Sequence, residues 1–162
     1  MSEKYDLLLK NVTVVDPLNR REEIADLAVA DGRVARLAAD ISPAQASQHF
    51  YLPGLCAVPG LVDLHTHASA WLGGRFGHKM LARAGVTTAL DMSGPIDSVL
   101  DIARDYGTGL NIACINYVRP GHTVKNDDPS AAELADLLSV SLSKGAIGLK
   151  LLGGHYPLTP GA

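Results

Sequence analysis

From residue 58 onward the chain alternates short apolar runs with helical segments, and this order restricts the fold more than any other feature. The apolar runs cover residues 58–64, 86–91, 110–118 and 146–152. The helical segments between them cover residues 76–84, 96–106 and 130–144, and a glycine follows each one. Strands that alternate with helices at this spacing predict βαβ units and a parallel sheet. We therefore expect an α/β fold with four buried parallel strands and three helices.

The first 55 residues have a different character and predict a small β module. Strands are expected over residues 5–15, 24–30, 33–37 and 49–52. Asp31-Gly32, between the second and third of these, predicts the tight turn of a hairpin. The sequence thus divides into a β module over residues 1–55 and an α/β part over residues 56–162.

The composition is that of a globular protein and argues against nucleic-acid-binding and membrane proteins. The 162 residues are 47% hydrophobic and 19% charged, with a net charge of -3. Positive charges are scattered, so no nucleic-acid partner is expected, and no apolar stretch approaches the length of a membrane span. The first residues have no apolar signal core, which predicts a cytoplasmic protein. Cys56 and Cys114 lack metal-ligand spacing and are expected to be buried free thiols.

His65 and His67 follow the first apolar run and are the strongest candidates for function. Alternate residues of a strand face the same way, so both imidazoles are expected to project together. Two such nitrogens are ready ligands for a transition metal. The spacing alone is a weak signal, and the alternative is a pair of hydrogen-bonded structural histidines.

Lys150 lies within the last apolar run and is the second candidate. Alternation places Ile147, Leu149 and Leu151 on one face, expected to pack on helices, and leaves Lys150 on a face of small residues. Burial lowers the pKa of a lysine, and a neutral amine reacts with carbon dioxide to give a carbamate that can bridge two metal ions. The alternative is a lysine whose charged end reaches solvent from the strand end.

Together these features resemble the amidohydrolase superfamily. Residues 58–67, Val-Pro-Gly-Leu-Val-Asp-Leu-His-Thr-His, closely resemble its first barrel strand. Residues 84–92 resemble its second strand, and Gly148-Leu149-Lys150 resembles its strand with the metal-bridging lysine. The resemblance is nearest to dihydroorotases, hydantoinases and N-acyl amino acid deacylases. It implies a partial (β/α)8 TIM barrel of about four strands, preceded by a small β-sandwich module.

The resemblance also implies a hydrolase of amide or cyclic amide C–N bonds. His65 and His67 would bind the more buried divalent metal, and carboxylated Lys150 would bridge it to a second one. A hydroxide held by the metals would attack the carbonyl carbon. Asp63 would support the histidines without binding metal. Zinc is the first choice for one or two ions, while manganese, cobalt and nickel suit the same ligands.

The chain departs from the superfamily pattern in its extent. Two further histidine ligands and the catalytic aspartate are expected beyond its last residue, so no catalytic residue is assigned. An isolated half-barrel has open strand edges, which predicts a fragment of a longer enzyme or a homo-oligomer. Asn116, Arg119 and His155 are candidate substrate contacts on the strand-end loops, and the role of His122 is left open.

Two other functions compete with the hydrolase. One is an inactive fragment or non-catalytic amidohydrolase-like protein, favoured by the missing half of the barrel. The other is a mononuclear deaminase, which would give Lys150 no evident purpose. The sequence does not name the substrate, beyond a small molecule with an amide or cyclic amide bond.

Overall fold

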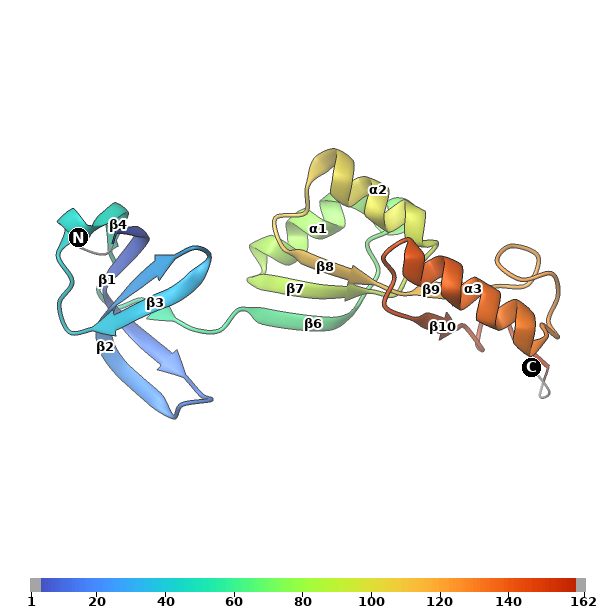
Figure 1. Cartoon of the computed structure of the whole chain (residues 1–162), viewed down its shortest axis with the longest axis horizontal. Helices are drawn as coiled ribbons and strands as arrows, with labels where there is room; N and C mark the ends of the chain where they lie inside the picture. The colour runs from blue at the N-terminus through green and yellow to red at the C-terminus, as the bar shows by residue number, and fades with distance from the viewer. Residues whose placement is uncertain (1–3, 160–162) are drawn as a thin grey trace. The chain divides into compact units, whose positions relative to one another are not determined.

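The computed structural model describes residues 4–159 and divides the chain into two compact units (Figure 1). The first unit ends at Pro59 and the second begins at Gly60. Each unit has its own sheet structure and is described by itself. Within residues 4–159 no helix is long and apolar enough to cross a membrane.

The first unit is built on one mixed sheet. Its strands are β1 (Tyr5–Asp16), β2 (Arg21–Ala30), β3 (Arg33–Ala38), β4 (Ala46–Tyr51) and β5 (Cys56–Ala57), with a short 3₁₀ helix, η1 (Pro43–Gln45), before β4. The strand order is β3-β2-β1-β4, antiparallel except that β4 and β5 run parallel to β1. The described residues show no second β layer of the expected sandwich. The expected boundary at residue 55 falls inside this unit, because β5 pairs with β1.

The hairpin at Asp31-Gly32 is confirmed. Asp31 and Gly32 have φ values of 50° and 70°, the left-handed conformation that a two-residue hairpin turn needs. The turn joins β2 to β3, whose register runs from Ala30 opposite Arg33 to Asp26 opposite Ala38.

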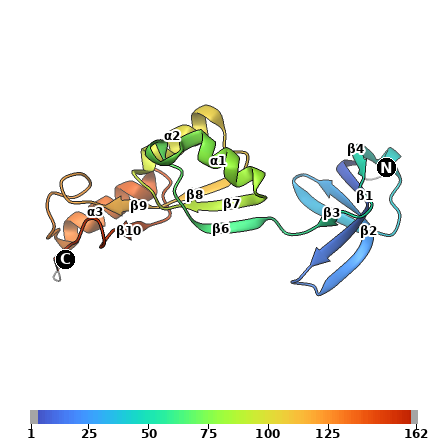
Figure 2. The same cartoon turned by 180° about the vertical axis from the view of Figure 1, so that it is seen from behind.

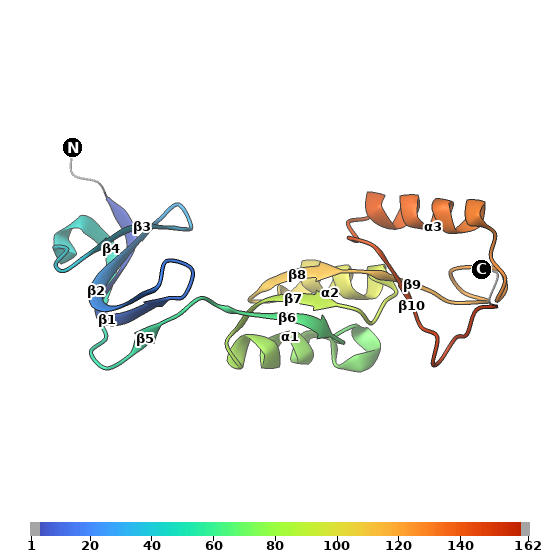
Figure 3. The same cartoon turned by 90° about the horizontal axis from the view of Figure 1, so that it is seen from below.

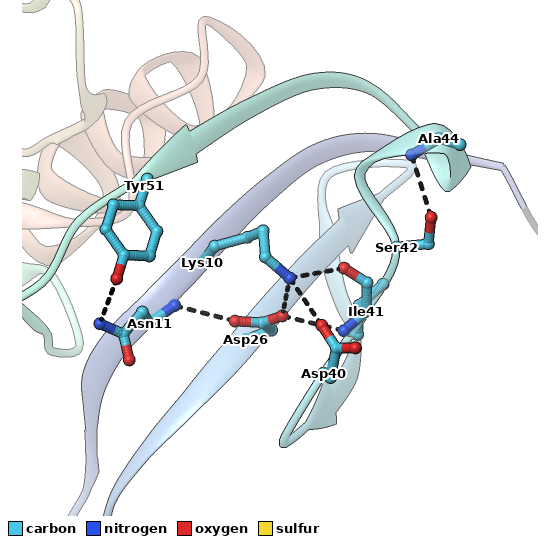
Figure 4. A network of polar contacts seen from close by, with 8 residues as sticks. All are labelled: Lys10, Asn11, Asp26, Asp40, Ile41, Ser42, Ala44 and Tyr51. Atoms are coloured by element: carbon cyan, nitrogen blue, oxygen red, sulfur yellow. Dashed lines mark hydrogen bonds and ion pairs between the residues drawn. The ribbon is translucent and has the colours of Figure 1, made fainter.

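A buried carboxylate ties the segments of this unit together (Figure 4). Asp26 is 3% exposed and accepts hydrogen bonds from Lys10 Nζ at 2.5 Å, Asn11 N at 2.8 Å and Ile41 N at 2.9 Å. Burial by itself raises the pKa of Asp26, but these donors outweigh it and hold the pKa below its usual range. The same contacts raise the pKa of Lys10, which also pairs with exposed Asp40.

The second unit has the predicted alternation of parallel strands and helices. Its elements are β6 (Leu61–Thr66), η2 (Ala70–Leu72), α1 (Gly74–Arg83), β7 (Val86–Asp91), α2 (Ile96–Tyr106), β8 (Asn111–Cys114), β9 (Asn116–Val118), α3 (Ala131–Ser143) and β10 (Leu149–Leu151). Strands β6, β7 and β8 pair in parallel, as do β9 and β10. Helices α1 and α2 lie on the same side of β6–β8 (Figure 2). The α/β prediction is confirmed.

The predicted strand over residues 110–118 is interrupted at Ile115. Its first part, β8, pairs with β7, and its second part, β9, pairs with β10. Hydrogen bonds cross the interruption on both sides, from Ile115 N to Asp91 O at 3.1 Å and from Ile147 N to Cys114 O at 2.9 Å. These hydrogen bonds connect the β6–β8 sheet to the β9–β10 sheet (Figure 3).

The helices end as the sequence predicts. Gly85, Gly107 and Gly145 follow α1, α2 and α3 closely with φ values of 87°, 68° and 102°, a conformation that glycine adopts without steric cost. Ser130 caps the start of α3, where its hydroxyl accepts a hydrogen bond from Glu133 N at 3.2 Å.

Three expectations about burial are wrong. Leu61, Val62 and Leu64 are each more than half exposed, because β6 is an edge strand that pairs only with β7 among the described residues. Ile147 and Leu151 are also exposed, and Ala146 packs against Ile96 and Val99 of α2 instead. Of the two free thiols, Cys114 is buried as expected but Cys56 is exposed.

Candidate active site

His65 and His67 project together from the end of β6. Their Nε2 atoms lie 3.2 Å apart, and their rings are stacked with centroids at 5.2 Å. Asp63 supports the backbone of this segment, because its Oδ1 accepts a hydrogen bond from His65 N at 3.0 Å. Asp63 thus holds the main chain of His65.

Lys150 reaches the histidine pair from β10, which is not a neighbour of β6. Its Nζ lies 3.4 Å from His67 Nε2 and donates a hydrogen bond to Met92 O, also at 3.4 Å. Met92 follows β7, so the lysine contacts the carboxyl ends of two other strands. The parallel arrangement brings these ends to one edge of the sheet, where α/β proteins hold their sites.

The surroundings of His67 lower its pKa and so favour its neutral form. Burial, the positive charge of Lys150 and the neighbouring His65 all lower the pKa of His67, against an opposing effect of Asp91. A neutral imidazole keeps a lone pair on one ring nitrogen, which is the form that binds a metal.

Asp91 positions the segment that follows the histidines, a role that the sequence did not reveal. It is fully buried at the end of β7. Its Oδ2 accepts a hydrogen bond from Ala68 N at 2.6 Å, and its Oδ1 accepts from Ser93 N at 2.8 Å and from the Ser93 hydroxyl. The carboxylate therefore holds the residue after His67 against the end of the neighbouring strand.

The geometry of the histidine pair fits a bound metal ion. Two nitrogens at about 2.0–2.1 Å from a tetrahedral zinc ion are separated by about 3.3 Å, close to the 3.2 Å between the two Nε2 atoms. Within residues 4–159 no group of three or more His, Cys, Asp or Glu side chains is arranged to hold a metal. A third ligand from this part of the chain would have to come from Lys150 in an anionic form.

A cavity of about 600 Å³ is formed in part by residues that follow β6, β7 and β10, whereas His65 and His67 line a separate cavity of about 450 Å³. The larger cavity is lined by Ser69, Trp71, Leu72, Ser93, Gly94, Pro95, Tyr117, Arg119, His122, Leu152 and Tyr156. Arg119 lies in its wall, as does His122, whose Nδ1 is 3.3 Å from the Tyr117 hydroxyl. Sequence reasoning missed the aromatic side chains Trp71, Tyr117 and Tyr156, because nothing in their spacing connects them.

Two of the candidate substrate contacts lie elsewhere. Asn116 is buried and turned toward α3, where its Nδ2 donates to Ser141 Oγ at 3.0 Å and its Oδ1 accepts from Tyr117 N at 3.0 Å. Its amide is thereby used within the fold, and the substrate contact expected of Asn116 stays a prediction. His155 is exposed and does not line the cavity.

Known proteins share this fold. No protein-family profile matches the chain. An allantoinase from Escherichia coli O1:K1 is 36% identical over 93 residues, which are 54% of this chain and 20% of the allantoinase. The N-acyl-D-glutamate deacylase of Bordetella bronchiseptica superposes with a TM-score of 0.70 over 98% of this chain and 40% of the deacylase, at 19% identity. L-hydantoinase from Arthrobacter aurescens gives a TM-score of 0.61 over 90% of this chain and 32% of its own, at 24% identity.

The chain is thus similar in sequence to allantoinases over part of its length and similar in fold to amidohydrolases. It spans about a fifth of the length of the allantoinases it matches. The similar structures include metal-bound proteins: the deacylase is complexed with zinc, and a D-aminoacylase with a TM-score of 0.68 at 23% identity has a binuclear metal centre. The histidine pair therefore lies in a fold whose similar structures include metal-bound proteins.

Proposed function

We propose that this chain carries one side of the metal site of a hydrolase that cleaves the C–N bond of an amide or cyclic amide. The supporting observation is the convergence of His65, His67 and Lys150. His67 Nε2 lies 3.2 Å from His65 Nε2 and 3.4 Å from Lys150 Nζ. These side chains meet although β6 and β10 are not neighbours in the sheet. His65 and His67 are the first two ligands, and N6-carboxylated Lys150 is the third.

Carboxylation would explain why a lysine lies beside the two histidines. A lysine ammonium so close to the two imidazoles would repel a divalent cation. When its neutral amine attacks carbon dioxide and loses a proton, the group becomes an anion with two oxygen ligands. The change replaces a positive charge beside the histidines with a negative one, so the same three side chains then attract a cation.

The types of ligand limit which metal ions would bind at this site. Imidazole nitrogens with a carbamate oxygen suit zinc first, and also manganese, cobalt or nickel. A divalent ion at this position would supply Lewis-acid activation of the amide carbonyl and of the attacking water. The chain's own residues orient the ligands: Asp63 fixes the backbone of His65, and Asp91 fixes the segment after His67.

A non-catalytic amidohydrolase-like protein is the second candidate. It is favoured because, within residues 4–159, no third His, Cys, Asp or Glu is arranged with the histidine pair to hold a metal. Such a protein would keep the fold and bind a metal weakly or not at all, and it would show no hydrolysis.

Metal analysis separates the two candidates. Metal-free protein is reconstituted with zinc and bicarbonate, its metal content is measured by mass spectrometry, and the same samples are screened against amides and cyclic amides. We expect His65→Ala and His67→Ala to abolish metal binding, and His155→Ala, an exposed loop change, to leave it intact. Lys150→Ala with full metal content would contradict the role of Lys150 as a ligand. Bound metal without hydrolysis of any substrate would favour the non-catalytic protein.

A further inference from the structure

A cavity of about 570 Å³ lies between α1 and the loop that follows α2. Its wall comes from one face of α1 and from residues 106–109 at the end of α2. The volume is in the usual range for sites that bind small molecules. None of the candidate metal ligands lines this cavity, so it is distinct from the site at the strand ends.

Two cations line this cavity, and none of the described residues that line it is acidic. Arg75 and Lys79 are four residues apart on α1, so their side chains leave the same face of the helix. None of the ion pairs found within residues 4–159 involves either of them. The chain as a whole has a net charge of -3, so a general attraction for anions is not expected. The two unpaired cations therefore favour an anionic ligand at this place in particular.

The acidic side chains nearest in sequence to the loop have a cation of their own. Arg104 Nη2 lies 2.8 Å from Asp101 Oδ1, and Arg104 Nε lies 3.3 Å from Asp105 Oδ1. Helix α1 itself contains no acidic residue. Arg75 and Lys79 are thus left without a carboxylate partner from either helix.

Arg75 is held against aromatic rings before any ligand arrives. Its guanidinium carbon lies 5.1 Å from the centroid of the Phe76 ring and 5.2 Å from that of the Tyr106 ring. Stacking of this kind uses the flat face of a guanidinium and leaves the N–H groups at its edge for an anion. Phe76 and Tyr106 are each 64% exposed, so both keep apolar surface that a planar group could cover.

The loop at residues 107–109 adds backbone donors to the wall. Gly107 and Gly109 have φ values of 68° and 72°. The N–H of Gly107 donates to Ala103 O, and the Thr108 hydroxyl is hydrogen-bonded to the backbone of Leu110. By contrast, no backbone hydrogen bond found within residues 4–159 uses the N–H of Thr108 or of Gly109. Unused N–H groups of a glycine-rich turn are typical donors to phosphate oxygens.

We propose that this cavity binds a phosphate monoester with a planar ring, in which Arg75 and Lys79 pair with the phosphate group. The ring of the ligand packs on the exposed surface of Phe76 and Tyr106. A phosphate monoester has a charge of about -1.5 to -2 at neutral pH, which matches two cations, whereas a single carboxylate would match only one. A guanidinium binds phosphate oxygens through two parallel hydrogen bonds, and the lysine ammonium adds a point charge.

Isothermal titration calorimetry tests this proposal with three probes. Adenosine monophosphate has both the phosphate and a planar ring, ribose 5-phosphate lacks the ring, and adenosine lacks the phosphate. The full chain is used free of metal and with a chelator present, so that no phosphate binds through an ion at the candidate metal site. Arg36→Gln is the matched control variant, because Arg36 is an exposed arginine of the first unit and its loss changes the net charge equally.

We expect one adenosine monophosphate to bind per chain, with ribose 5-phosphate and adenosine each at least roughly 10-fold weaker. Arg75→Gln and Lys79→Gln should each weaken binding by roughly 10- to 100-fold, the range for losing a hydrogen bond to a charged group. Arg75→Lys should recover part of the loss, and Arg36→Gln should change nothing.

The proposal is overturned if adenosine monophosphate does not bind, if ribose 5-phosphate or adenosine binds as tightly, or if Arg75→Gln or Lys79→Gln binds like the wild type. The C-terminal end of α2 also attracts cations, so a purely structural role for Arg75 predicts a lower Tm for Arg75→Gln and no binding. That result would likewise reject the proposal. Circular dichroism of each variant identifies one that has not folded, and Lys79→Gln then replaces Arg75→Gln in the comparison. The titration needs neither metal nor hydrolysis, so its outcome is independent of the proposed hydrolase.

Discussion

The amine of Lys150 lies 3.4 Å from His67 Nε2, although the two residues are 83 positions apart in the chain. His67 directly follows the first strand of the second unit, β6, and Lys150 lies in the last, β10. Carboxylation would convert this contact between two basic groups into one between an imidazole and an anion, both suited to a shared metal.

Carboxylation of Lys150 should depend on metal. We expect protein supplied with ¹³C-bicarbonate and zinc to show a carbamate carbon signal by NMR, and the metal-free protein to show little or none, because the ion stabilises the anion. Lys150→Arg should remove the signal. Lys144→Arg is the control, because Lys144 is exposed and pairs with Asp97. A carbamate signal that persists in Lys150→Arg would contradict the prediction.

Asp26→Asn should destabilise the first unit by about 2–4 kcal/mol, because it breaks a buried ion pair and places an amide donor among three donors. Urea denaturation measures the change. Asp40→Asn is the matched control, since Asp40 also pairs with Lys10 but its side chain is 89% exposed. We expect Asp40→Asn to cost less than about 1 kcal/mol.

The carboxylate of Asp26 should also make the free energy of unfolding of the first unit depend on pH in acid. The folded-state pKa of Asp26 is lower than its unfolded value of about 3.9, so its contribution is complete above that value and is lost as pH falls through the folded-state pKa. We expect the free energy of unfolding of the first unit to decline below about pH 4. Asp26→Asn should flatten this part of the profile, and an unchanged profile would show that other carboxylates govern it.

The two thiols should differ sharply in reactivity. Burial, helped by Asp91, raises the pKa of Cys114 to about 11, whereas Cys56 is exposed. The thiolate is the reactive form, so iodoacetamide at neutral pH should modify Cys56 and spare Cys114 in the folded protein. Mass spectrometry should find one modified thiol per chain, two in denaturant, and none in folded Cys56→Ser. Equal rates at the two thiols would contradict the buried position of Cys114.

Gly94→Ala should disturb the cavity of about 600 Å³ more than a comparable glycine change. A Cβ at Gly94 would meet the Tyr117 ring at 2.2 Å, in addition to the strain of its φ of 45°. Gly121→Ala is the control, because Gly121 has a φ of 71° but no atom within 4 Å of the added Cβ. We expect losses of about 2–4 kcal/mol for Gly94→Ala and about 1–2 kcal/mol for Gly121→Ala in thermal denaturation. Equal losses would mean that Tyr117 moves aside freely.

The open edge of β6 should make the chain self-associate. Leu61, Val62 and Leu64 are exposed on a strand that pairs on one side only within residues 4–159. We expect Val62→Lys to lower the apparent mass in concentration-dependent sedimentation, because a charge on an edge strand opposes pairing. Leu18→Lys, at an exposed turn position of the first unit, should not. A monomeric wild type at all concentrations would refute the expectation of a homo-oligomer.

Local sequence determined much of this protein. Residues 86–91 and 96–106 form a strand and a helix with the predicted bounds, because their apolar spacing and the glycine at 107 act within one element. The Asp31-Gly32 turn followed from two residues that tolerate positive φ. The position of His65 and His67 at a strand end was determined in the same way, since alternation along a strand is a local property.

Tertiary structure decided what no short segment encodes. Strand pairing interrupted residues 110–118 at Ile115, and the edge position of β6 left Leu64 exposed. Packing between distant segments turned Asn116 toward Ser141 and brought Arg119 over Tyr156. The reason is physical: the chain's own periodicity fixes which residues share a face, whereas packing between distant segments fixes what that face meets.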